Sequence, residues 1–565
     1  MKYVADFETT SSSQYEIDGH TRVWAVAVMD IESEKLELLS NNIDDFFAWA
    51  FTDNRQHKTK EVYFHNLKFD GPFIIHWLFK NGFKHSKERK LKEKEFSTLI
   101  SNTGIWYNIT ICYKRFKTRA NFVKIFDSLK KLPMSEERIA KSFNLEVQKG
   151  SIDYEKYRPV GYELNDDEKE YIISDVKIMA QALKIQFGQG LTKMTIGSDA
   201  MDNFKERLGN KNYKYLFPVL DNTIDSDLRL SYKGGWTYLK PEYAGKVIKN
   251  VLSYDVNSLY PSVMKSPHVL PIGDPIYFKG KYKEDKVYPL YIQYIRCRFE
   301  IKKDHLPTIQ LKNNWLFKST EYLTSSGHEV VNLALTSIDL KLFLDHYNVY
   351  ELEYLEGFKF MGITGIFDEY IDYWYEIKNN TKDGERELAK LMLNNLYGKF
   401  GTNPRFIPYI PTFVDGEVKY VAGDEEIRDA VYVPMASFIT AYARNKTIRT
   451  AQKLYKHFVY ADTDSLKLIN ITHEEVCKII DVDNEKLGAW AYEGMSELGK
   501  FLKPKTYILS TGGKLNIKVA GLSKEGRDNI TFENFKLGYQ SSDASFKAKK
   551  VRGGVILEKR IFTIK

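Results

Sequence analysis

Short runs of apolar, β-favouring residues alternate along the chain with stretches that have the period of an amphipathic helix. The runs predict strands at residues 3–9, at 251–256 and on both sides of 460–465. The helical period predicts a helix over 386–398, with Gly398 as its stop signal. The pattern therefore predicts a protein that mixes helices and strands, with polar residues at several strand ends.

The stretch 460–465, Tyr-Ala-Asp-Thr-Asp-Ser, lies between two predicted strands and has the composition of a tight turn. Asp462 and Asp464 are two residues apart, so in extended backbone their side chains project to the same side. Two carboxylates that close repel each other, and a divalent cation such as Mg²⁺ removes the conflict. Taken alone, the stretch is equally typical of a hairpin turn with solvated aspartates.

Two further stretches carry chemistry of the same kind. Asp255 ends the strand 251–256, and one strand-end aspartate with a hairpin pair is the minimum for two metal ions that hold phosphates. The helix 386–398 follows Lys378, and one of its stripes suits a triphosphate and a base. The alternative for this stripe is the solvated face of an amphipathic helix. The stripe consists of Arg386, Lys390, Asn394 and Tyr397.

The three stretches resemble the three polymerase signatures of family B DNA polymerases. They read Asp-x-x-Ser-Leu-Tyr-Pro from Asp255, Lys-x-x-x-Asn-x-x-Tyr-Gly from Lys390, and Tyr-x-Asp-Thr-Asp-Ser from Tyr460. Their order and spacing resemble the protein-primed replicative polymerases of small Bacillus phages, and the likeness covers the whole chain. One departure is Asn395, where the family pattern has Ser; it affects the details of nucleotide selection rather than activity.

Four more carboxylates lie in the N-terminal third. Asp6 and Glu8 share one face of the first predicted strand, Asp70 follows a second strand, and Tyr171 and Asp175 are neighbours on a predicted helix. Carboxylates gathered in this way can hold two metal ions and orient a water molecule, although each alone is typical of a surface acid.

Together these carboxylates resemble the 3′–5′ proofreading exonuclease site of family B polymerases. The resemblance implies metal binding by Asp6, Glu8, Asp70 and Asp175, with Tyr171 and Lys149 assisting hydrolysis. Phe69 and Tyr154 suit base stacking, but they are equally typical of core aromatics. The residues implied to hold a frayed single-stranded 3′ end are Thr9, His65, Asn66, Phe69, Ser128, Leu129 and Tyr154.

The resemblance also implies roles at the polymerase site. Asp255, Val256 and Asp464 would bind Mg²⁺, for which Mn²⁺ could substitute, with Asp462 in support. Tyr260 would exclude ribonucleotides, because a ring under the sugar collides with a 2′-hydroxyl. The implied nucleotide-binding residues are Val256, Tyr260, Lys378, Arg386, Lys390 and Tyr397. The implied DNA-binding residues are Tyr232, Gly234, Gly235, Asn394, Thr440, Arg444, Lys505 and Tyr507.

The same resemblance divides the chain into domains and implies an α/β and α+β multidomain fold. Residues 267–365 are too many for a loop, and Asp415-Gly416 predicts a hairpin within 401–430. In the family, insertions at these two places bind the terminal protein and encircle DNA. The implied parts are an RNase H-like exonuclease domain (1–195), a right-hand palm in two pieces (196–266 and 431–522), insertion 1 (267–365), fingers (366–400), insertion 2 (401–430) and thumb (523–565).

Composition narrows the cellular setting. A net charge of +8 and an aromatic content of 14% favour a polyanionic partner and base stacking. The three cysteines are far apart and lack metal-ligand spacing, which argues against a zinc module and indicates a reducing compartment. We find no apolar run of membrane length and no signal-peptide pattern, so we expect the cytoplasm, by resemblance that of an infected bacterial host.

The resemblance implies a DNA-directed DNA polymerase that replicates a linear genome by protein-primed initiation, processive strand-displacing elongation and proofreading. Its partners would be primer-template DNA, a displaced single strand, dNTPs, and a terminal protein that primes as a heterodimer partner; otherwise we expect a monomer. Two alternatives are a stand-alone nuclease and a non-catalytic DNA-binding replication factor. The intact set of Asp255, Asp462 and Asp464 argues against the first, and seven metal-capable carboxylates argue against the second.

Overall fold

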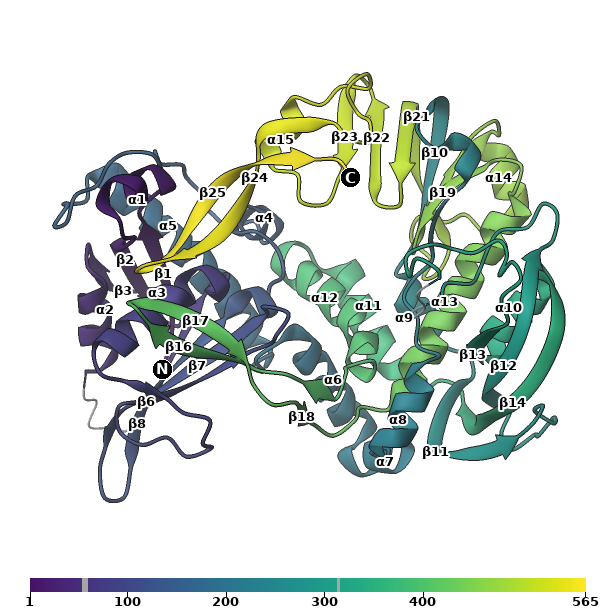
Figure 1. Ribbon diagram of the computed structural model, residues 1–565, viewed down its shortest axis with the longest axis horizontal. Coiled ribbons are helices and arrows are strands. Elements are labelled where there is room, and N and C mark those ends of the chain that lie inside the picture. Colours follow the sequence, from purple (N-terminus) through teal and green to yellow (C-terminus); the bar gives the residue numbers. More distant parts are fainter. Residues whose placement is uncertain (53–58, 312–315) are drawn as a thin grey trace.

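An eight-stranded sheet forms the N-terminal body of the computed structural model, which describes residues 1–52, 59–311 and 316–565 (Figure 1). In sheet order its strands are β3 (Leu36–Ser40), β2 (Val23–Asp30), β1 (Lys2–Thr9), β4 (Lys60–Phe64), β8 (Ala120–Asp127), β7 (Trp106–Arg115), β6 (Glu95–Ile100) and β5 (Lys84–His85). The helices of this body are α1 (Ser12–Asp18), α2 (Ile43–Ala50), α3 (Leu67–Lys80), α4 (Glu136–Ser142) and α5 (Asp166–Gly188), with a 3₁₀ turn at Ser128–Lys130.

Alternation along β1 decides which side chains meet which helices. Tyr3 and Phe7 belong to the hydrophobic core that contains α2 and α3. Val4 belongs to a second core on the other face of the sheet, and that core contains α5. Asp6 and Glu8 alternate in step with Val4, so they lie on the α5 face.

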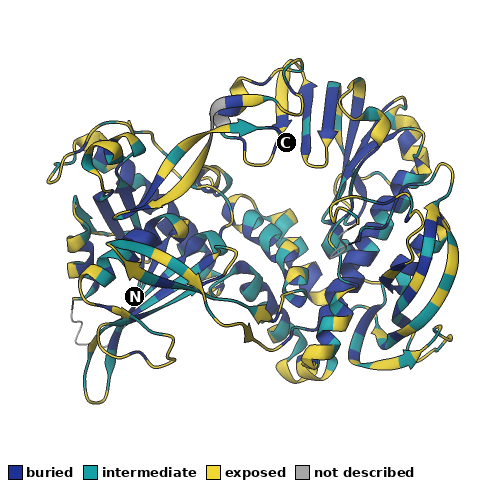
Figure 2. Cartoon of the chain, viewed as in Figure 1, coloured by how far each residue is buried: buried dark blue, intermediate teal, exposed yellow. Residues whose placement is uncertain are grey.

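A seven-stranded sheet forms the second large body. Figure 2 shows most of its central strands and the long helix beside them as buried. Its order is β23 (Lys514–Lys518), β22 (Thr506–Thr511), β21 (Trp490–Lys503), β10 (Val247–Val256), β20 (Ser465–Leu468), β19 (Phe458–Asp462) and β9 (Thr237–Leu239). The helices around it are α6 (Ile196–Leu208), α7 (Asn210–Leu216), α8 (Asn222–Arg229), α9 (Leu259–Met264), α13 (Val433–Lys453) and α14 (His473–Ile479), with a 3₁₀ turn at Pro241–Tyr243.

Two helices, α11 (Asp368–Asn380) and α12 (Asp383–Phe400), cross between the two bodies (Figure 1). The predicted helix over 386–398 is confirmed, but the prediction that Gly398 ends it is wrong. Gly398 lies inside α12, and the helix ends at Phe400 before Gly401. A helix tolerates an interior glycine at a cost of about 1 kcal/mol, and the buried side chains of Leu396 and Phe400 hold this turn in place.

The segments before and after these two helices fold as small β units. Residues 267–365 contain a four-stranded sheet with the order β11 (Leu270–Lys279), β14 (Tyr347–Ile363), β12 (Leu290–Ile301) and β13 (Val331–Thr336), together with α10 (Ser337–His346). The hairpin predicted at Asp415-Gly416 is confirmed: β16 (Tyr409–Val414) pairs with β17 (Glu417–Ala422), and both turn residues have positive φ. Beside it, β15 (Arg405–Phe406) pairs with β18 (Glu426–Ile427).

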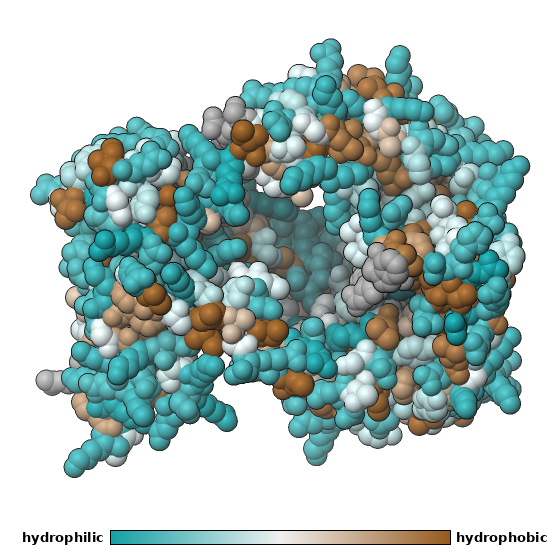
Figure 3. All heavy atoms as spheres, in the orientation of Figure 1, coloured by the Kyte–Doolittle hydropathy of each residue, from teal (hydrophilic) through white to brown (hydrophobic). Residues whose placement is uncertain are grey.

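The C-terminal hairpin, β24 (Gln540–Val551) and β25 (Gly554–Thr563), follows α15 (Lys524–Asp528) and extends to the N-terminal body (Figure 1). At its tip, Thr21 donates a backbone hydrogen bond to Arg552, and Val555 is buried in the core beneath α3. Gly553 permits this contact, because a Cβ there would lie 2.1 Å from the Thr21 carbonyl oxygen. The hairpin thus closes a ring, and Figure 3 shows a deep recess inside it.

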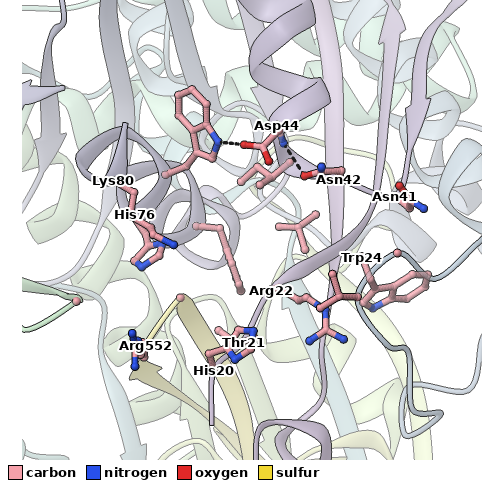
Figure 4. Close-up of a pocket in the computed structure, with 18 of the residues that line it drawn as sticks. His20, Thr21, Arg22, Trp24, Asn41, Asn42, Asp44, His76, Lys80 and Arg552 are labelled. Atoms are coloured by element: carbon pink, nitrogen blue, oxygen red, sulfur yellow. Dashed lines mark hydrogen bonds between the residues drawn. The ribbon is translucent and has the colours of Figure 1, made fainter. Parts of the chain in front are cut away.

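A pocket of about 890 Å³ lies at this junction (Figure 4). Its lining combines the hairpin tips at Gly416 and Arg552 with residues of the N-terminal body such as Arg22 and His76. Its described lining contains none of the seven predicted carboxylates. Among the described helices, we find none long and apolar enough to span a bilayer.

Candidate active sites

The first candidate site lies between β1 and α5. Asp6, Glu8 and Asp175 can each offer one oxygen such that these atoms lie within 4.8 Å of one another. The strand places Asp6 and Glu8 two residues apart on its α5 face, and Asn165 starts α5 with a capping box. The structure therefore assembles three of the four carboxylates predicted here; Asp70, on α3, is outside this close group.

Burial and mutual repulsion govern the ionisation of these carboxyl groups. Burial, together with the neighbouring carboxylates, raises the pKa values of Asp6 and Asp70 well above their usual range. For the same reasons the pKa of Glu8 rises to about 8 and that of Asp175 to about 6. Asp70 Oδ1 and Asp175 Oδ1 are buried and have no hydrogen-bond partner among the described residues. These oxygens fit a hard divalent cation, which would remove the repulsion.

Lys149 and Tyr171 join this site as predicted from the sequence. Lys149 Nζ donates to Asp175 Oδ2 at 2.7 Å and also to a carboxylate that sequence motifs missed, Glu136. The Tyr171 hydroxyl lies 2.7 Å from that of Tyr154, whose ring is largely exposed. A cation, a phenol and an accessible aromatic ring therefore surround the carboxylates.

The residues predicted to hold the 3′ end of a DNA strand differ in their exposure and in the hydrogen bonds that they already make. Asn66 is exposed, whereas His65 and Ser128 hydrogen-bond to each other at 3.1 Å. Asp127, which no sequence motif marks, is 2% exposed. Asp127 Oδ1 accepts backbone hydrogen bonds from Asn66 and Leu129, among others, so it fixes the loops that carry the predicted residues. Thr9, Phe69 and Leu129 are half-buried along the same edge.

The second candidate site lies at the ends of three adjacent strands. Asp255 is the penultimate residue of β10, and Asp462 ends β19. Ser465 of β20 pairs with both of them, and the backbone N–H of Val256 donates to the Asp464 carbonyl at 2.8 Å. The predicted hairpin at 460–465 is confirmed, and strand register together with the turn brings the three aspartates to one edge of the sheet.

The carboxyl groups of this second site are half-exposed and interact electrostatically. Burial and the charge of Asp464 raise the pKa of Asp255 to about 7, and burial also raises the pKa of Asp464. Asp462 is held differently, because its Oδ1 accepts a hydrogen bond from Thr237 Oγ1 at 2.8 Å. Lys467, missed in the sequence, is buried two residues beyond Ser465 on the same strand face. The Asp255–Asp464 pair has the donor chemistry that Mg²⁺ requires.

A cationic stripe and two stacked rings flank this second site. Lys378 Nζ donates to Ser258 Oγ at 3.1 Å, and Arg386 donates to the Lys378 carbonyl at 2.9 Å. Burial, together with the positive charges of Arg386 and Lys390, lowers the pKa of Lys378. Tyr260 stacks on Tyr397 with ring centroids 3.9 Å apart. The predicted nucleotide-binding residues therefore occupy one region, from α9 across α11 to α12.

The loop with Tyr232, Gly234 and Gly235 contacts the turn between β19 and β20 at Thr463. A Cβ on Gly235 would lie 2.6 Å from the Thr463 side chain, so only glycine permits this approach. Arg444 is 3% exposed; it pairs with Asp339 at 2.7 Å and donates to the Gly234 carbonyl at 2.8 Å.

Thr440 is also buried and bonds back to its own helix, at the Ala436 carbonyl. Thr440 and Arg444 thus make contacts within the protein, and Arg444 supports the loop that carries Gly234. Their predicted DNA-binding role stays a prediction. Lys505 and Tyr507 lie on the other side of the turn. The exposed Lys505 Nζ is 3.8 Å from Asp462 Oδ1, and its backbone N–H donates to the Tyr460 hydroxyl. Asn394 is exposed on α12.

Comparison with known proteins decides the family. A family model described as DNA polymerase type B, organellar and viral, matches residues 51–481. The DNA polymerase of Bacillus phage B103 is 44% identical over 584 residues, which cover 100% of this chain and 99% of that protein. The chain belongs to the type B DNA polymerases. Like them it is a nucleotidyltransferase, and the family resemblance seen in the sequence is confirmed.

A further relative, the polymerase of another Bacillus phage, agrees with this chain over its whole length in both sequence and structure. The DNA polymerase of Bacillus phage phi29 is 43% identical, with 100% of this chain and 99% of that protein covered. A solved structure of the phi29 enzyme with primer-template DNA and incoming nucleotide substrates superposes with a TM-score of 0.93, 43% identity and full coverage of both chains. The multidomain α/β architecture is therefore shared with the phi29 enzyme.

Proposed function

We propose that this polymerase extends DNA at the Asp255–Asp464 site and shortens mispaired 3′ ends at the Asp6–Glu8–Asp175 site. The observation that carries the proposal is the presence of two separate carboxylate clusters, each with the donor chemistry of a divalent-metal site. DNA and dNTPs are the proposed substrates, in line with the ligands of the solved phi29 enzyme. We also propose the domain boundaries that the family resemblance implies.

At the polymerase site Asp255, Asp464 and the Val256 carbonyl would hold Mg²⁺, and Asp462 would support the site. When bound, the ions would supply charge neutralisation for the phosphates. Lys378, Arg386 and Lys390 neutralise the triphosphate, which suits the cluster that they form. The Tyr260–Tyr397 stack frames the sugar and base, and Tyr260 excludes a 2′-hydroxyl. The DNA strands would be held by the 232–235 loop and by Asn394, Thr440, Arg444, Lys505 and Tyr507.

At the exonuclease site Asp6, Glu8, Asp175 and Asp70 would hold the ions and orient a water molecule. Lys149 donates to the phosphodiester that is cleaved, and the Tyr171 hydroxyl, held by Tyr154, orients the reacting groups. Phe69 and Tyr154 offer stacking surfaces to the last bases. The frayed strand end lies along Thr9, His65, Asn66, Ser128 and Leu129.

A primer-extension experiment tests this division. A labelled primer on a longer template is incubated with Mg²⁺, with and without dNTPs, for the wild type and Asp464→Asn. We expect lengthening with dNTPs and shortening without them, and the variant loses only the lengthening. Shortening alone in the wild type would favour a stand-alone nuclease, and no change in any lane would contradict both sites.

We further propose that the closed ring retains DNA during strand-displacing synthesis, and that a terminal protein primes initiation at the 267–365 segment. Gly553→Ala tests the ring, because the added Cβ collides with Thr21 at a backbone φ of 99°. A strain of about 1–3 kcal/mol should open the tip and shorten the product of one binding event severalfold.

Gly513→Ala provides the matched control for Gly553→Ala. Gly513 also has positive φ (74°), but it lies in open space, so substitution there strains the backbone without a collision. Product length is measured with a DNA trap that captures dissociated enzyme. Equally reduced product lengths in both variants would contradict the role of the hairpin tip in retaining DNA.

Transfer of a labelled nucleotide onto a protein would test priming by a terminal protein.

A further inference from the structure

Glu136 lies in the proposed exonuclease site, although no motif contains it. It is in the first turn of α4, and its side chain is 14% exposed. Its carboxylate accepts a hydrogen bond from Lys149 Nζ, which also donates to Asp175 at 2.7 Å. The Lys149 ammonium therefore bridges two carboxylates, one inside the metal-capable cluster and one outside it.

This bridge restrains a side chain that would otherwise be mobile. Lys149 lies in the irregular segment between α4 and α5, and its four-carbon stem has many rotamers. One ion pair, with Asp175, fixes the ammonium on one side and leaves the long stem freedom to reach that carboxylate in several rotamers. A second carboxylate on the other side of the ammonium confines it to the position beside Asp175.

The placement of Glu136 distinguishes a positioning role from metal binding. Among the described residues, the close group of ligand atoms contains Asp6, Glu8 and Asp175 but not Glu136. The strongest contact of Glu136 is with Lys149, and through space its charge raises the pKa values of Asp6, Asp70 and Asp175. Glu136 thus belongs to the site electrostatically, and among the described residues its side chain forms an ion pair with the Lys149 ammonium.

We propose that Glu136 is a positioning residue of the proofreading reaction, which holds the Lys149 ammonium beside Asp175 to meet the phosphate of the shortened strand. This assignment rests on the proposed exonuclease function. It adds to that function a carboxylate whose main effect on hydrolysis passes through the position of Lys149.

A double-mutant cycle tests the assignment. Glu136→Gln, Lys149→Met and the double variant are compared for shortening of a labelled single strand at saturating Mg²⁺. We expect Glu136→Gln to slow shortening about tenfold, as is usual when a supporting partner is lost. In the Lys149→Met background the same change should have little effect. Glu136→Asp should restore part of the rate, and Glu137→Gln, whose carboxylate pairs with Lys141, should match the wild type.

A second measurement does not depend on metal or activity. The rate at which an acylating reagent modifies Lys149 in EDTA, followed by mass spectrometry, should rise in Glu136→Gln because the ammonium is released. A wild-type rate of both shortening and acylation in Glu136→Gln would overturn the assignment, as would an undiminished effect in the Lys149→Met background. If the wild type shortens no strand, the proposed exonuclease function fails and the assignment fails with it; otherwise only the assignment is at stake.

Discussion

The two carboxylate sites of this polymerase are built by different means. The proposed exonuclease site, called the exonuclease site below, joins β1 to α3 and α5, which are distant in sequence, and Asp70 and Asp175 are 3% and 1% exposed. The polymerase-site aspartates are half-exposed: Asp255 and Asp462 lie at the ends of β10 and β19, on either side of β20, and Asp464 lies in the turn between β19 and β20. Side-chain packing thus positions the first site and strand pairing the second. We therefore expect substitutions in the hydrophobic core to disturb the exonuclease site more than the polymerase site.

The two sites also differ in the cation that accompanies them. In the exonuclease site Lys149 contacts Asp175 directly. In the polymerase site the exposed Lys505 Nζ lies 3.8 Å from Asp462 Oδ1. Lys467 is buried in the sheet below the aspartates, with Glu493 at 3.8 Å as its ion-pair partner. Burial raises carboxyl pKa values in both places, but it raises four of them in the exonuclease site. A proton therefore competes with a cation more strongly there.

The largest expected effect comes from Asp175→Asn, the counterpart of Asp464→Asn. Loss of this carboxylate should slow shortening roughly a thousandfold, since metal-held charge stabilisation is worth several kcal/mol. Lengthening on a matched primer-template should stay near the wild-type rate, because Asp175 lies on α5 beside Asp6 and Glu8, in the N-terminal body. Rates of both reactions on one labelled substrate measure this. Equal loss of lengthening would show that the two sites are not independent.

Thr237→Val should have a smaller effect, and only on lengthening. Thr237 lies on β9 opposite Asp462 and donates to its carboxylate at 2.8 Å. Hydrogen bonds to charged groups are worth about 1.5–3 kcal/mol, so single-nucleotide incorporation should slow about tenfold. Thr237→Ser keeps the hydroxyl and should retain most of the rate. If Thr237→Val incorporated a nucleotide at the wild-type rate, strand pairing would hold Asp462 without this hydrogen bond.

The sequence predicted the polymerase site better than the residues that support it. The Asp462–Asp464 hairpin and the 386–398 helix have local signals, namely turn residues and helical period, and both are confirmed. The ion pair of Arg444 with Asp339 joins segments 105 residues apart, and no local pattern announces it. Glu136 was missed for the same reason, because its partner Lys149 comes from another segment. Contacts that form only by tertiary packing produce no periodic pattern of hydrophobic and polar residues in the sequence.

The smallest expected effect is a difference in how pH changes the Mg²⁺ requirement of the two reactions. Below its pKa a carboxyl group is protonated and must lose the proton before it binds a cation. With the pKa of Glu8 at about 8, the Mg²⁺ needed for half-maximal shortening should rise as pH falls through 8. For lengthening the rise should begin near pH 7, where Asp255 titrates.

Between these two pH values the Mg²⁺ midpoint for shortening should therefore shift severalfold more than that for lengthening, up to about tenfold per pH unit for each competing proton. Midpoints are measured for both reactions on the same enzyme preparation, so a general loss of folded protein moves both alike and cancels in their ratio. If the ratio of the two Mg²⁺ midpoints stayed constant with pH, the different burial of the two sites would not be the cause of their pH dependence. A ratio that rises only below pH 7 would shift the cause from Glu8 to Asp175, whose pKa is about 6.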